Sequence, residues 1–69
     1  MQVLQQPRQL FRLKRVIELV GYQKSTIYQK IQAGEFPAPI PIGARAVAWN
    51  SESIFQWIDS KIDAAGRGK

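Results

Sequence analysis

Apolar residues near the start of the chain recur with the spacing of a short helix. One helical face, at positions i, i+3, i+4 and i+7, is formed by Leu13, Val16, Ile17 and Val20. Gly21 follows where a helix C-terminus favours a left-handed residue, because glycine has no Cβ to clash there. The pattern predicts a helix over residues 13–20 that ends at Gly21, preceded by a short strand over residues 10–12.

A second helix is expected almost at once, because only a few residues separate Gly21 from the next helical pattern. It begins at residue 23 or 24 and ends at residue 33, with Ile27 and Ile31 facing inward and Gly34 placed to stop it. The face turned to solvent is polar and basic, and it carries Ser25, Gln29, Lys30 and Gln32. Two helices joined by a short glycine turn are typical of a helix-turn-helix, whose second helix enters the DNA major groove.

The middle of the chain predicts a β-hairpin. Prolines at positions 37, 39 and 41 exclude a helix and disfavour a central strand. Apolar residues nevertheless alternate around Gly43-Ala44-Arg45-Ala46, with Ile40 and Ile42 before it and Val47 and Trp49 after it. We therefore expect an edge strand, a turn that contains Arg45, and a returning strand.

A third helix is predicted to begin near Ser51 and to end by Ala65. Asn50 and Ser51 are both good N-cap residues, and Glu52 places a negative charge where the helix dipole favours it. Its apolar face comprises Ile54, Phe55, Trp57, Ile58 and Ile62. Because Trp49 and Trp57 both lie within apolar patterns, we expect them in the core rather than on a base-stacking surface.

Length and composition narrow the function classes. A chain of 69 residues supports one domain, which we place at 10–65 between a flexible arm at 1–9 and a basic flexible tail at 66–69. The chain has no Cys and no His, and it has no glycine-rich phosphate loop, so we expect no metal, no cofactor and no enzyme activity. No apolar run approaches the roughly 20 residues of a membrane span and no signal-peptide core follows Met1, so we expect a cytoplasmic protein without a membrane partner.

The net charge points to a polyanionic partner. Ten Lys and Arg against five Asp and Glu give +5 and an isoelectric point of about 10.1. Phosphate neutralisation with counterion release favours nucleic acid. An anionic membrane surface would instead attract a long helix with a strongly apolar face and basic flanks, which the pattern does not predict.

Taken in order, these segments resemble the AlpA family of small phage and prophage transcriptional regulators, which is related in fold to excisionases and to the MerR-type winged helix. The matching residues span about 10–62 and are Arg12-Leu13, Val16, Gly21, Ser25-Thr26-Ile27-Tyr28, Gly34-Glu35-Phe36-Pro37-x-Pro39, Gly43-x-Arg45, Val47-x-Trp49 and Ile54-x-x-Trp57-Ile58. The chain departs from the family at Lys14-Arg15, where a pair such as Pro-Glu is usual, and at Gln23, where Ser or Gly normally caps the helix. The resemblance implies a mainly α fold with a small β-hairpin: a winged helix-turn-helix of three helices plus a wing.

The residues expected to contact DNA lie on the first two helices and the hairpin, and are Lys14, Arg15, Lys24, Ser25, Thr26, Tyr28, Gln29, Lys30 and Arg45. The second helix supplies contacts to base edges and phosphates, and a Gln29 amide can pair with adenine through two hydrogen bonds. As the wing of a winged helix does in the family, Arg45 is expected to enter a minor groove or to contact the adjacent backbone. Thr26 either packs near the turn or contacts a phosphate. Tyr28 either packs in the core or places its hydroxyl on the DNA backbone. For Lys14 and Arg15, simple exposure to solvent stays open as the alternative to a phosphate contact.

Three classes of function follow. The first is a sequence-specific regulator that binds double-stranded DNA, either as a transcription factor or as an excisionase-like factor that bends attachment-site DNA. Its partners would be further copies of the chain, as a dimer or a head-to-tail array, and an integrase or RNA polymerase. The second is a protein-interaction module that docks through the third helix at residues 54–62. The third, an enzyme, has almost no support in the sequence.

Overall fold

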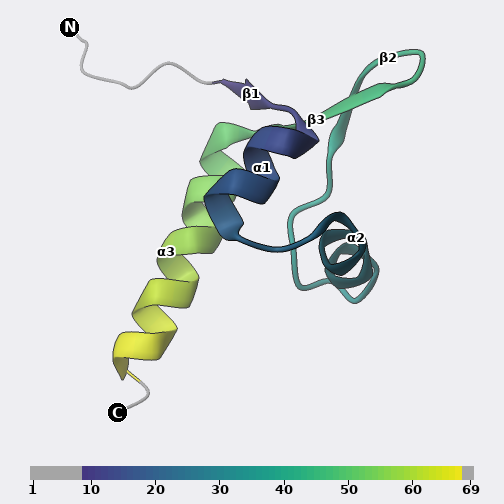
Figure 1. Ribbon diagram of the computed structural model, residues 1–69. Coiled ribbons are helices and arrows are strands. Elements are labelled where there is room, and N and C mark those ends of the chain that lie inside the picture. Colours follow the sequence, from purple (N-terminus) through teal and green to yellow (C-terminus); the bar gives the residue numbers. More distant parts are fainter. Residues whose placement is uncertain (1–8, 68–69) are drawn as a thin grey trace, which may run out of the picture.

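The computed structural model describes residues 9–67, so residues 1–8 of the predicted arm and residues 68–69 of the predicted tail lie outside it. The elements follow one another as β1 (Leu10–Phe11), α1 (Leu13–Val20), α2 (Lys24–Gln32), β2 (Ile40–Gly43), β3 (Ala46–Asn50) and α3 (Ser51–Arg67) (Figure 1). Three helices with a small antiparallel sheet confirm the predicted fold class. No helix within the described residues is long and apolar enough to cross a membrane.

Both short helices end in glycines with left-handed backbones, as their positions predicted. Gly21 has φ +79°, and its N–H donates to the carbonyl of Ile17 at 2.9 Å. After α2, Gly34 has φ +77° and donates to the Ile31 carbonyl at 3.1 Å, while the Glu35 N–H donates to the carbonyl of Lys30 at 2.8 Å. This second pair is a Schellman motif, which satisfies carbonyls left without partners inside the helix.

The sheet has the order β1-β3-β2, with both pairings antiparallel. Leu10 lies opposite Asn50, and Phe11 opposite Trp49, so the short strand β1 fastens the start of the domain to the strand that precedes α3. The hairpin of β2 and β3 extends away from the helices (Figure 1). We call this hairpin, with its turn, the wing (residues 40–50).

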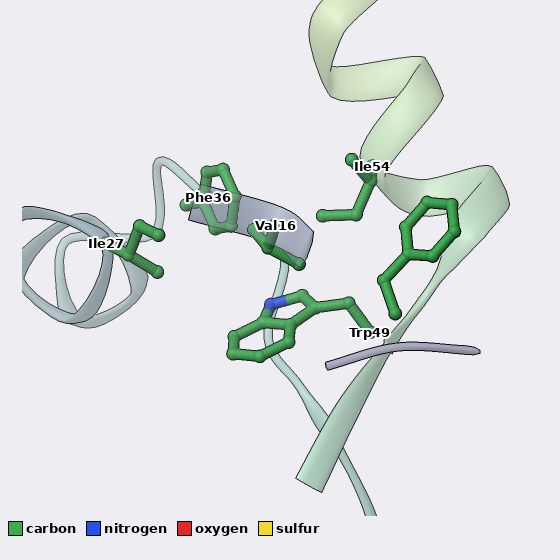
Figure 2. Packing of buried hydrophobic residues seen from close by; sticks show 6 residues of the cluster. Val16, Ile27, Phe36, Trp49 and Ile54 are labelled. Atoms are coloured by element: carbon green, nitrogen blue, oxygen red, sulfur yellow. The ribbon is translucent and has the colours of Figure 1, made fainter. Parts of the chain in front are cut away.

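The three helices, β1, β3 and the loop after α2 all contribute to a small core (Figure 2). Its fully buried side chains are Val16, Ile27, Trp49 and Ile54, and Phe11 and Phe36 are nearly as buried. Trp49 is in the core as predicted, and its indole N–H donates to the Pro37 carbonyl at 2.9 Å. Trp57 lies at the edge of the core instead, half-buried against Phe36, with a ring-centroid separation of 4.9 Å.

The third helix differs from its prediction in three respects. Asn50 alone of the two candidates caps it: its Oδ1 accepts the Glu52 N–H at 2.9 Å, whereas the Ser51 hydroxyl oxygen accepts the N–H of Gln9 at 3.0 Å. The helix continues past residue 65 to Arg67, because Gly66 does not adopt a left-handed backbone. Its apolar face is only partly covered, since Phe55 is 44% exposed and Ile62 65% exposed.

Candidate nucleic-acid interface

The outer face of α2 presents two polar side chains, Ser25 and Gln29, opposite its buried one, and Lys24 is exposed as the first residue of the helix. Lys24, Ser25 and Gln29 are exposed, while Ile27 is fully buried in the core. The helix begins without a side-chain cap, because Gln23 is extended and makes no capping hydrogen bond. The first-turn N–H groups of α2 therefore have no side-chain cap, and the exposed Lys24 is the first residue of the helix; both features favour an anionic oxygen at this end.

Thr26 and Tyr28 occupy the border between this face and the core. Both are half-buried. The Tyr28 ring lies 6.4 Å from that of Trp49, tilted by 60°. Tyr28 therefore packs on the core edge through its ring.

Lys30 does not share the exposed position that the helical pattern predicted for it. Its side chain is 32% exposed, and its Nζ lies 3.6 Å from Glu35 Oε1 and 5.4 Å from the centroid of the Tyr22 ring. The amphipathic side chain covers an aromatic ring while its charge meets a carboxylate. Lys30 thus ties the end of α2 to the loop that follows and to the helix-turn-helix turn.

A basic cluster surrounds the N-terminus of α1. Lys14 and Arg15 are exposed there, and no acidic residue occupies the first turn. Arg15 also forms an exposed ion pair with Glu18, at 3.6 Å, and lies 5.8 Å from the centre of the Phe11 ring. Arg12, which sequence reasoning did not select, is exposed at the N-cap position and adds a third cation. The run Arg12-x-Lys14-Arg15 was the signal that would have found it.

The wing carries Arg45 at its exposed turn. Between positions 36 and 51, Arg45 is the one charged residue in the sequence. An arginine on a projecting, otherwise uncharged hairpin can approach a phosphate or a narrow groove without a neighbouring carboxylate to oppose it.

Charge separates along the fold. Residues 9–50 contain six Lys and Arg and two Glu, a net +4, whereas α3, residues 51–67, contains one Lys, one Arg and three acidic residues, a net −1. In Figure 1, α2 and the wing lie to one side of α1, and α3 runs away from them toward its free end. The basic surface therefore comprises α1, α2 and the wing, and α3 lies outside it. Within residues 9–67 no three acidic side chains are grouped closely enough to hold a metal ion.

Comparison with known proteins places these elements in a family context. Over residues 9–62 the chain matches the family model described as prophage CP4-57 regulatory protein (AlpA), and this span includes every candidate DNA-contacting residue. The chain is also similar to a protein of Enterobacteria phage P4, uncharacterized protein ORF88, with 37% identity over 57 residues. That match covers 83% of this chain and 65% of the relative, so the chain spans slightly less than two thirds of the phage protein's length.

Proposed function

Because this chain belongs to the AlpA family of prophage regulatory proteins, we propose that it is a transcriptional regulator that binds double-stranded DNA with sequence specificity, in a phage, a prophage or another mobile element. The observation that carries the proposal is the two-sided character of α2. Ile27 anchors one side in the core, while Ser25 and Gln29 stand exposed on the opposite side and Lys24 is exposed at the start of the helix. A helix fixed in this way can enter the major groove without rearrangement.

Each candidate residue has a role in this proposal. Gln29 and Ser25 read base edges, where a glutamine amide suits adenine. Phosphate contacts come from Lys24 and from Lys14 and Arg15, whose charge at a helix N-terminus is compensated by an anion. Three residues at the border of the exposed face of α2 line the edge of the DNA contact: Thr26, Tyr28 and Lys30. Arg45 of the wing enters the adjacent minor groove or contacts the DNA backbone.

One such domain covers about one half-site, which limits its affinity. We therefore expect several copies to bind side by side on repeated or inverted sites. An integrase or RNA polymerase is the next partner to test, because recombination and transcription are the two processes that the family resemblance implies.

The experiment is a mobility-shift titration with fragments from around the chain's own gene, with excess nonspecific competitor and at several salt concentrations. Lys24→Ala and Arg45→Ala should each weaken the discrete shift and lower the slope of log K against log salt by about 0.9, the value for one lost phosphate contact. Lys61→Ala is the matched control, because it removes one positive charge from α3, outside the basic surface of α1, α2 and the wing.

Two results would contradict the proposal. If the wild type gives only a smear that salt or competitor removes, the charge acts without sequence readout. If Lys61→Ala reduces binding as much as Lys24→Ala, net charge rather than the α2 surface determines affinity.

A second function is favoured by one observation on α3. Phe55 and Ile62, two turns apart on the same face, are 44% and 65% exposed. Apolar side chains so placed suit a protein partner. Under this alternative, Ile62→Ser would abolish complex formation with that partner and would leave the DNA titration unchanged.

A further inference from the structure

The wing exposes apolar side chains that the fold does not need. Ile40 is 40% exposed and Ile42 42% exposed, although both belong to β2, an edge strand whose four residues are all exposed. The nearest bulky neighbour toward the tip is Arg45, because Gly43, Ala44 and Ala46 are small. The tip is therefore narrow and presents one isoleucine and one cation.

Ile42 holds a special place in the register. Pro41 pairs with Val47 and Gly43 pairs with Ala46, so two steps along β2 match one step along β3, and Ile42 is the additional residue. A bulge of this kind bends the strand and redirects the side chain of the unpaired residue. Ile40, by contrast, lies opposite Ala48 in the regular part of the ladder, closer to the helices.

We propose that Ile42 enters the DNA minor groove together with Arg45 and wedges against a base step, so that the bound duplex bends at the wing. This inference rests on the proposed function and adds to it a residue that sets sequence preference through DNA deformability. The minor groove is about 6 Å wide, which suits a tip of Gly and Ala, and its negative potential attracts an arginine. Apolar wedges such as isoleucine partly unstack base steps in other minor-groove proteins.

The charge of the hairpin argues for DNA as the occupant of this apolar surface. No acidic residue lies between positions 36 and 51, so the phosphates on either side of the groove meet Arg45 and no opposing carboxylate. A wedge at this position would make pyrimidine–purine steps the preferred contact, because those steps are the easiest to kink.

The test measures bending and affinity together on a fragment with one binding site and a fluorophore at each end. Wild-type chain should shorten the end-to-end distance of the fragment, as a kink of roughly 20–90° would. Ile42→Ala should restore most of the free-DNA distance and weaken binding about tenfold, while Ile40→Ala, an equally exposed isoleucine on the same strand, should leave the distance unchanged and alter binding less than twofold. Replacing a pyrimidine–purine step under the wing with an A·A step should weaken the wild type but not the Ile42→Ala variant.

The outcomes separate this inference from the function beneath it. If the wild-type chain does not bind any fragment specifically, the proposed function is overturned. Specific binding without bending, or equal effects of the Ile42 and Ile40 variants, would overturn the wedge alone. If Ile42→Ala left the single-site bend intact but removed cooperativity on a fragment with several sites, the apolar wing would contact a second copy of the chain and the wedge would be wrong.

Discussion

Substitution of Gly21 tests how much the left-handed backbone at this residue contributes to the stability of the helix-turn-helix. Its φ of +79° lies in the left-handed region, and a Cβ built at this position meets no atom within 4 Å. Substitution by alanine therefore creates no steric clash with the rest of the protein. The change in the free energy of unfolding comes from backbone conformation alone.

The magnitude follows from two opposing terms. A residue with a Cβ in the left-handed region loses about 1–2 kcal/mol, and the stiffer alanine returns about 0.4–1 kcal/mol by restricting the unfolded chain. We expect Gly21→Ala to lower the free energy of unfolding by about 1 kcal/mol. At about 4–8 °C per kcal/mol for a domain of this size, the midpoint of thermal unfolding should fall by a similar number of degrees.

Circular dichroism at 222 nm, recorded during heating and in a urea titration, measures both quantities. Gly66→Ala is the matched control, since an added Cβ there also meets nothing within 4 Å but the residue lies inside α3 without a positive φ. That variant should be neutral or more stable by up to about 1 kcal/mol, because alanine is the better helix former. The reasoning is refuted if Gly21→Ala is as stable as the wild type, or if the two variants shift stability in the same direction.

Two further predictions concern the indoles and the cap of α3. Trp49→Phe should lower the free energy of unfolding in urea by about 2–4 kcal/mol, because the buried side chain leaves a cavity and a carbonyl without its donor. Trp57→Phe should lower it by about 1 kcal/mol, since its hydrogen bond to the Glu35 carbonyl is exposed; equal losses would contradict this difference. Asn50→Ala should lower it by about 1 kcal/mol through loss of the cap on the Glu52 N–H, and Asn50→Asp, which keeps the acceptor, should not.

Local signals explain why most of the fold could be predicted from the sequence. The bounds of α1 and α2 follow from a helical apolar period closed by glycine, and both glycines have the left-handed backbone that the prediction required. The exposure of Ser25 and Gln29 follows from the same period, because both lie on the side of the helix opposite Ile27, and Lys24 is exposed because it is the first residue of α2.

The features that sequence reasoning missed depend on contacts between distant residues. Ser51 is as good a cap as Asn50 on local grounds, but pairing of β1 with β3 brings Gln9 to its hydroxyl, 42 residues away in the chain. Lys30 is half-buried for a local reason instead: it lies three residues after the buried Ile27, near the buried side of α2, where it meets Glu35 and the Tyr22 ring. The bulge at Ile42 depends on how two strands align, which alternation of apolar residues does not specify.

The loop between α2 and the wing links the two DNA-reading elements of the proposal, and two indoles hold it. Trp57 of α3 donates to the carbonyl of Glu35, and Trp49 of β3 donates to that of Pro37, each at 2.9 Å. Phe36, between them in sequence, is buried in the core. Because α2 and the wing are thereby fastened to one core on both sides of a short loop, their separation is fixed before DNA arrives. A protein that binds one major groove and the neighbouring minor groove needs that fixed separation, because the entropy lost in ordering the two elements on binding would reduce affinity.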